Sequence, residues 1–455
     1  MRVHSNSAHL IWPPAPYAAG FCITDDTDAA TLDQVTAVYD YLAMRKFRTT
    51  KTVWAFHPEE ASGIPGLPGH ALQGVTLENP RYMEFCQQLS KEGFEICLHG
   101  ASAGNNRRAR QEAALQLVRD SFGGAGTYVC HSKNAENIYW EENVTRLQPF
   151  RTMLGYFSRH QCSGEDPASP YFWGDLCNEH VEQIRLMRTR ATNTLSVNPS
   201  MPYFDPGKPY VRSWFCATKR ALRDCASEQA LASLRREHGL TVLYQYLHRY
   251  ADEDTLRLNT EFVSAIDRIC DAEDVLVAPV SLIMRRLRLL QGVFICSSSN
   301  SHWALNINTE DACDVQLGIN GSSGKTIRLP VLPAGKIIEL DLPSDLRMTG
   351  RNAVSLNRRR SAVHRWPAGT LAVNCSDSTV NLSTAQTLPS MSWDFHPRTA
   401  APHRPLSCLP RREEFRLLIA QSAIILREMV FLNRRMNTIE YLRHAPTRME
   451  LQENW

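Results

Sequence analysis

The sequence lacks several features that would place a chain in a large class at once. Its 13 cysteines contain no CxxC pair and no regular spacing, so no disulfide framework is indicated and we expect a reduced, cytoplasmic protein. No uncharged apolar run reaches the length of about 18 residues that a membrane span needs. The N-terminus also lacks the apolar core of a signal peptide, which agrees with a cytoplasmic location.

A strong excess of one charge is absent as well. Lysine and arginine total 50 and aspartate and glutamate total 47, for a net charge of +3. This balance gives no general case for binding nucleic acid or an anionic membrane. With 455 residues that are 43% hydrophobic, the chain can bury a sizeable core, and its length suggests two or three domains.

The pattern that is present from residue 18 to 292 is an alternation of short apolar runs with amphipathic stretches. Runs such as "GFCIT", "TVWAF", "FEICLHG", "TYVCHS" and "LTVLYQYLH" alternate with helical patterns, which predicts an α/β fold with a parallel sheet covered by helices. Polar residues that could carry chemistry stand where the apolar runs end: Asp25, Asp26, His99, His131 and His248. In a closed α/β barrel these ends form one rim, where sites are built.

The composition changes after Gly292. Residues 293–400 show short alternating runs separated by Asn, Gly, Ser and Pro, which predicts a smaller β-rich, sandwich-like domain. Residues 401–455 contain a helical pattern with one apolar face. This C-terminal helical segment could pack on the protein's own core, or it could bind a protein partner.

Three short motifs in the first region occur in an order that resembles a known family. The motifs are "ITDDTD" at residues 23–28, "EICLHG" at 95–100 and "YLH" at 246–248. The set resembles the polysaccharide deacetylase family, also called NodB-homology domains. The resemblance covers roughly residues 18–292 and implies a distorted (β/α) barrel of about seven strands.

The resemblance also implies roles for individual residues. The family's TFDDG motif supplies a general base and then a metal ligand, which correspond to Asp25 and Asp26. The first His of the family's His-Ser/Thr-x-x-His motif corresponds to the metal ligand His99, and the family's late-strand His corresponds to His248 as the catalytic acid. The implied cofactor is a divalent metal ion, with zinc as the expected ion.

The chain departs from the family at the second metal histidine. That histidine should lie four residues after His99, where the sequence has Ala103. His131 also ends an apolar run, so we expect it to replace the missing ligand. No clear match to the family's Arg-x-Pro-Tyr motif is present, since "MPYFDP" shares only Pro-Tyr.

These residue types suit hydrolysis of an amide or ester. A divalent metal lowers the pKa of a bound water and polarises a carbonyl. Two imidazoles and a carboxylate leave open positions on such an ion, and a second carboxylate can take a proton. The alternative for Asp25, Asp26 and Asp28 is capping of the helix that follows, because anions favour a helix N-terminus. The alternative for each histidine is a structural, hydrogen-bonded role.

Aromatic residues gather in "SPYFWGD", "NPSMPYFDP" and "PYVRSWF". Aromatic rings can stack on sugars, so Trp173, Asp175 and Tyr203 are candidate substrate-binding residues. Packing of long loops over the barrel is the alternative.

The leading hypothesis from the sequence is a metal-dependent carbohydrate deacetylase-like hydrolase that acts on N- or O-acyl groups of a saccharide, in surface polysaccharide metabolism. The cytoplasmic location favours a soluble or lipid-linked intermediate as substrate. One rival is a catalytically silent barrel that binds saccharide, which the loss of the second histidine favours. The other rival is an interaction protein of a polysaccharide-synthesis assembly.

Overall fold

The computed structural model describes most of the chain. The described residues are 7–61, 73–124, 126–131, 134–145, 147–157, 162–297, 301–320, 325–350, 352–355, 362–366, 369–376, 379–384 and 412–422. Of the segment predicted as a helical tail, residues 401–411 and 423–455 therefore lie outside the described part.

Seven parallel strands form a closed barrel. They are β2 (Ala19–Asp25), β3 (Thr50–Val53), β4 (Glu95–Leu98), β5 (Thr127–Val129), β6 (Gln183–Thr189), β7 (Trp214–Thr218) and β8 (Leu240–Gln245). Each strand pairs with the next, and β2 closes the ring by pairing with β8 on one side and β3 on the other. The short strand β9 (Val275–Val277) pairs with the first half of β2. The predicted α/β barrel of about seven strands is thus confirmed.

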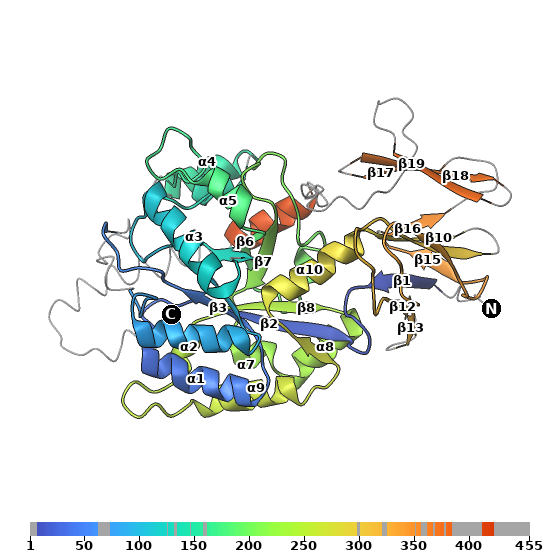
Figure 1. Ribbon diagram of the computed structural model, residues 1–455. Coiled ribbons are helices and arrows are strands. Elements are labelled where there is room, and N and C mark those ends of the chain that lie inside the picture. Colours follow the sequence, from blue (N-terminus) through green and yellow to red (C-terminus); the bar gives the residue numbers. More distant parts are fainter. Residues whose placement is uncertain are drawn as a thin grey trace.

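Helices surround this barrel, as Figure 1 shows. They are α1 (Leu32–Met44), α2 (Pro80–Lys91), α3 (Arg108–Phe122), α4 (Phe150–Phe157), α5 (Gly174–His180), α6 (Thr194–Val197), α7 (Leu222–Cys225), α8 (Glu228–Glu237), α9 (Thr260–Cys270) and α10 (Val280–Gln291), with the 3₁₀ turns η2 (Glu141–Val144) and η3 (Leu247–Tyr250). Every residue of β2 is buried, as expected for a parallel strand covered on both faces. None of the described helices is long and apolar enough to cross a membrane.

The start of α1 decides between two interpretations of the aspartates before it. The N-cap residue is Thr31, whose hydroxyl accepts a hydrogen bond from the backbone N–H of Gln34. A hydroxyl at this position satisfies a free N–H of the first helical turn. Asp25, Asp26 and Asp28 are therefore not the capping residues of α1, and another cause must explain why three carboxylates follow β2.

Three smaller sheets follow the barrel in the described part of the chain, beginning with β10 (Val293–Ser297). Most of their strand pairs are antiparallel, but two of the sheets each contain one parallel pair. One four-stranded sheet contains β10, β11 (His302–Asn306), β14 (Ile337–Leu340) and β16 (Ala353–Ser355); a second contains β1 (Ser7–Ile11), β12 (Gln316–Asn320), β13 (Thr326–Arg328) and β15 (Arg347–Thr349); and a third contains β17 (Ala362–Trp366), β18 (Gly369–Ser376) and β19 (Thr379–Thr384). The strand β1 pairs with β12, so the described chain runs from the β-rich part at residue 7 into the barrel (Figure 1).

A helix at residues 412–422 packs against the barrel loops. Leu417 and Leu418 are fully buried, and the Glu413 carboxylate accepts hydrogen bonds from the backbone N–H and the hydroxyl of Ser200, both at 2.7 Å. The ring of Phe415 contacts Phe150 of α4 edge-to-face, although Phe415 remains 47% exposed. This part of the predicted tail therefore contributes to the protein's own core.

Candidate metal centre

Three side chains meet at the rim formed by the carboxyl ends of the barrel strands. Asp28 lies three residues after the end of β2, His99 directly follows β4, and His131 follows β5. The Nε2 atom of His99 is 3.0 Å from Asp28 Oδ1, and the Nε2 atom of His131 is 3.6 Å from Asp28 Oδ2. All three side chains are buried, and one ligand atom from each lies within 4.8 Å of the others. The structure thus brings the predicted residues His99 and His131 together, with Asp28 as the carboxylate of the group.

Hydrogen bonds fix the orientation of both imidazole rings. The Nδ1 atom of His99 is 3.1 Å from the carbonyl oxygen of Val129, which can only accept. The Nδ1 atom of His131 is 3.0 Å from Oδ1 of Asn134. Each ring therefore carries its proton on Nδ1, and each Nε2 presents a lone pair toward Asp28. This is the tautomer in which imidazole binds a metal through Nε2.

The electrostatics of this group favour a cation between its members. Two nitrogen lone pairs and a carboxylate repel one another when nothing positive lies between them. Among the described residues, His131 Nε2 and Asp28 Oδ1 are buried and have no hydrogen-bond partner. Burial alone would lower the pKa of His131, but the carboxylate of Asp28 raises it above its ordinary value. Burial would raise the pKa of Asp28, but interactions with His131 and His99 hold it well below the usual range. These interactions are favourable when a positive charge, either a proton on an imidazole or a metal ion, lies between the three groups. Two imidazoles and one carboxylate fit a divalent ion such as zinc.

Trp54 forms one wall of the group. Its ring lies 4.9 Å from the His99 ring and 5.0 Å from the His131 ring, and its side chain is fully buried. Gly100 follows His99 with φ of +93°, and its nearest neighbours include Trp54. A side chain at this residue would be strained in the left-handed region, so the glycine lets the chain turn directly behind the ligand.

Asp26 lies beside the group but is held by an arginine. Its two carboxylate oxygens accept hydrogen bonds from the Arg185 guanidinium at 2.8 and 2.7 Å, and Asp26 Oδ2 is 3.6 Å from His99 Nε2. Arg185 belongs to β6, is buried, and also lies over the ring of Tyr244 at 4.2 Å. The sequence did not point to Arg185. The available signal was a single arginine within the apolar run "QIRLM".

Asp25 makes different contacts. Its Oδ2 is 3.2 Å from Nζ of Lys51 and accepts a hydrogen bond from the hydroxyl of Tyr39 at 2.9 Å, while its Oδ1 accepts from the backbone N–H of Leu247 at 2.8 Å. Tyr39 belongs to α1, so this carboxylate faces the helix layer. Burial raises the pKa of Asp25. Its oxygens are occupied by these donors, away from the two imidazoles.

His248 lies on η3 close to the same rim. Burial and then the neighbouring Arg249 lower the pKa of His248 to about 3, so its ring is neutral at neutral pH. Its Nδ1 atom is buried without a hydrogen-bond partner among the described residues. Tyr246 lies next to it, with ring centroids 6.4 Å apart, and the Arg249 guanidinium lies 4.3 Å from the centre of the Tyr246 ring.

The three residues predicted to contact substrate lie elsewhere. Trp173 is fully buried and its indole N–H donates to the carbonyl oxygen of Glu136. Tyr203 is 1% exposed. Asp175, at the start of α5, forms a two-pronged ion pair with Arg108 of α3, and its side chain is 54% exposed. Trp173 and Tyr203 therefore present no ring face to a sugar, and Asp175 is the exposed member of the set.

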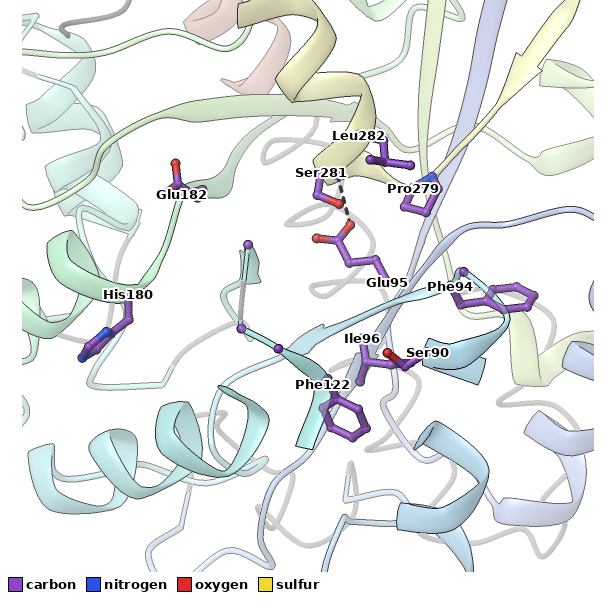
Figure 2. Close-up of a pocket in the computed structure, with 14 residues that line it drawn as sticks. Ser90, Phe94, Glu95, Ile96, Phe122, His180, Glu182, Pro279, Ser281 and Leu282 are labelled. Carbon is purple, nitrogen blue, oxygen red and sulfur yellow. Dashed lines mark hydrogen bonds between the residues drawn. The ribbon is translucent and has the colours of Figure 1, made fainter. Parts of the chain in front are cut away.

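A separate hollow of about 530 Å³ lies at the opposite end of the barrel strands. Figure 2 shows Glu95 at the start of β4 and Ser281 at the start of α10. The Glu95 carboxylate accepts from the backbone N–H of Ser281 at 3.0 Å and from the hydroxyl of Thr50 at 2.8 Å. Glu95 thus caps α10 from a neighbouring strand, and the metal-binding group lies at the other rim.

Comparison with known proteins gives two solved structures. No family model and no curated protein matches the chain. A protein from Mycobacterium smegmatis assigned as a polysaccharide deacetylase matches with 12% identity and a TM-score of 0.36, over 63% of this chain and 95% of its own. One from Pseudomonas aeruginosa PAO1 with the same assignment matches with 9% identity and a TM-score of 0.34, over 59% and 91%. The closed parallel barrel agrees with the fold that the motif resemblance implies.

Proposed function

We propose that the protein is a metal-dependent hydrolase that removes acyl groups from a saccharide. The observation that carries the proposal is the convergence of Asp28, His99 and His131, with both Nδ1 atoms used in hydrogen bonds and both Nε2 atoms directed at the carboxylate. The saccharide as substrate follows from the resemblance to polysaccharide deacetylases. The predicted cytoplasmic location favours a soluble or lipid-linked saccharide.

The metal would be held by these three side chains, with zinc as the expected ion. Bound there, it would polarise the acyl carbonyl and lower the pKa of a water molecule. The protein holds each ligand from a different strand end of a closed barrel, so the distances between the three ligands depend on the barrel rather than on one flexible loop. Trp54 excludes water from one side of the imidazoles, which strengthens the electrostatic interactions between the group and a substrate.

We assign the general base to Asp26 in place of Asp25. Asp26 Oδ2 lies 3.6 Å from the metal-facing nitrogen of His99, and Arg185 holds the carboxylate in one orientation. A water bound beside His99 would be within reach of Asp26, which could take its proton. Asp25 is engaged by Lys51, Tyr39 and Leu247 on the other side of the strand.

His248 would act on the acyl group of the substrate and not on the attacking water. Because burial and Arg249 lower its pKa to about 3, the ring enters the reaction neutral and can donate one N–H hydrogen bond. Such a donor stabilises the negative oxygen that forms when water attacks an acyl carbon. The neutral ring has no further proton to give, so the leaving group would take the proton that Asp26 has gained from the water. Tyr246, half-buried beside His248, offers the aromatic contact that Trp173 and Tyr203 do not.

Metal content and acyl release test this function together. Purified protein should contain about one equivalent of divalent metal, and it should release acetate from N-acetylated or O-acetylated oligosaccharides. Asp28→Asn should lose both the metal and the activity. Asp267→Asn is the control for the same substitution away from the rim, because Asp267 lies on α9, where it contacts Arg45.

Two results would contradict the proposal. A protein that never binds metal and never releases acetate, yet binds glycans, would be the silent saccharide-binding barrel. In this proposal His131 would supply the imidazole that is expected at Ala103, so the loss of that histidine does not by itself favour a silent barrel. Full activity of Asp28→Asn after metal removal would rule out the metal centre.

A further inference from the structure

The two loops that carry the histidines are joined by a buried polar network. Its centre is Glu136, a carboxylate that is 1% exposed. The Glu136 carboxylate accepts hydrogen bonds from the backbone N–H of Asn106 at 3.0 Å, from Asn106 Nδ2 at 2.6 Å and from Asn134 Nδ2 at 3.0 Å. No arginine or lysine pairs with Glu136 among the described residues, so this carboxyl group is held by amide donors alone, and burial raises its pKa.

The network fixes the orientation of the Asn134 amide. Asn134 Nδ2 lies at hydrogen-bond distance from three acceptors, namely the carbonyl oxygens of Ser102 and Gly104 and the carboxylate of Glu136. An amide nitrogen donates and cannot accept, so Nδ2 must occupy this side and Oδ1 must face His131. Oδ1 is 3.0 Å from His131 Nδ1. The proton of His131 is therefore held on Nδ1 by an acceptor whose own orientation is fixed.

We propose that Asn134 and Glu136 are positioning residues that hold His131 in its metal-binding tautomer. The inference rests on the proposed metal centre and adds to it. Glu136 orients Asn134, Asn134 orients His131, and the same hydrogen bonds tie the His131 loop to the loop at 102–106 that follows His99. This arrangement explains how a histidine from the neighbouring strand end can replace one that would otherwise lie on the same loop as His99.

The proposal assigns no contact with substrate to either residue. Both side chains are buried, and both act through His131. Outer hydrogen-bond partners of metal ligands typically affect metal affinity about 10–100-fold. We therefore expect Asn134→Leu, which removes the acceptor and the donors at similar volume, to weaken metal binding by about 10–100-fold.

A swapped pair of substitutions separates positioning from simple structural support. In Asn134→Asp combined with Glu136→Gln, a carboxylate oxygen still accepts from His131 Nδ1, and the new glutamine amide can donate to that carboxylate. The swap should recover part of the lost metal affinity but not all of it, because the second oxygen of the new carboxylate would face the carbonyl oxygens of Ser102 and Gly104, to which Asn134 Nδ2 donates. Asn134→Asp alone places two carboxylates next to each other and should recover less, because like charges repel.

The test measures Co²⁺ and Zn²⁺ affinity and the visible absorption of the Co²⁺ complex, together with thermal unfolding of the metal-free proteins. Weaker binding and a changed Co²⁺ spectrum in Asn134→Leu, with partial recovery in the swapped variant, would support the proposal. Wild-type affinity in Asn134→Leu would overturn it, whether or not stability falls. If the wild type itself binds no metal, the proposed function fails with it, which is a different result.

A second measurement needs no variant. Nitrogen NMR of metal-free wild-type protein with labelled histidine, recorded at a pH high enough that the His131 ring is neutral, should find its single proton on Nδ1. A neutral ring with its proton on Nε2 would overturn the proposal even if the substituted proteins do not fold.

Discussion

Replacing Asp25 by asparagine should destabilise the barrel and leave its metal affinity nearly unchanged. Lys51 is 0% exposed and Asp25 is 1% exposed, and their charged atoms are 3.2 Å apart. In Asp25→Asn the ammonium group of Lys51 would remain buried without its carboxylate. Breaking one partner out of a buried pair costs about 3–5 kcal/mol.

This cost is large enough to measure by thermal unfolding. For a domain of about 150–250 residues each kcal/mol lowers the Tm by about 2–4 °C, so Asp25→Asn should lower it by about 6–20 °C. Asp28→Asn is the matched substitution with the opposite expected result: metal affinity is lost, while the Tm of the metal-free protein changes little. Removing both charges of the Asp25–Lys51 pair, in Asp25→Asn combined with Lys51→Met, should recover part of the stability, because no buried charge is then left without a partner.

One outcome would refute this reasoning. If Asp25→Asn kept the Tm of the wild type and lost either metal or catalytic rate, Asp25 would belong to the reaction centre, as the family motif implies. The Lys51 contact would then be incidental. Unfolding of the metal-free protein and metal content of the reloaded protein together distinguish the two roles.

Three further predictions follow from other contacts. Zinc at about 100 times its Kd should stabilise the wild type by about 2.7 kcal/mol, measured as a rise in Tm, and should not stabilise Asp28→Asn. The pKa of His248 is lowered to about 3, so below about pH 6.5 the unfolded chain binds a proton at this residue that the folded protein does not bind. The free energy of unfolding should therefore fall as the pH drops from about 6.5 toward 3. Urea unfolding should show that this fall is smaller in His248→Asn. Glu413→Ala should leave the donors of Ser200 with fewer acceptors at a cost of about 1–3 kcal/mol, with faster hydrogen exchange at residues 412–422; an unchanged exchange rate would show that this contact does not hold the helix.

The barrel could be predicted from the sequence because buried parallel strands leave a simple signal. Five of the seven strands, β2, β3, β4, β5 and β8, are short apolar runs that could be identified in this way. The strand β6 carries two arginines, and neither β6 nor β7 was identified from the sequence. The rim could be predicted for the same reason, since polar residues directly after such runs must lie at the carboxyl ends of the strands. His99 and His131 were found in this way, and they meet because β4 and β5 are neighbours in the barrel.

The choice among the three aspartates could not be made from motif position alone. Side chains alternate between the two sides of a strand, and Thr24 and Asp26 both contact Arg185, whereas Asp25 contacts Lys51 and Tyr39. Asp28 lies three residues beyond the end of β2, where this alternation no longer applies. The sequence therefore predicts that Asp25 and Asp26 point to opposite sides of β2. It does not show which of the two sides faces the histidines, because that depends on how the neighbouring strands pair.

The β1 strand and the Asn134–Glu136 network were not predicted, for a related reason. The strand pairs Ser7 with Asn320, and nothing local in "SAHLI" indicates a partner so far along the chain. Asn134 and Glu136 lie in a loop, where no periodicity marks a buried side chain.

A common physical principle connects the metal centre with the two buried ion pairs beside it. Asp25 is neutralised by Lys51 and Asp26 by Arg185, so these two carboxylates already have cations of the protein's own. Asp28 is the third buried carboxylate of the same segment, and its described neighbours are two imidazoles whose protons are turned away from it. A buried carboxylate without a cation is costly, and the fold gives a fixed cation to two of the three. The third is left for a cation from solution, and this contrast between Asp28 and its two neighbours is the strongest reason to expect a metal at this rim.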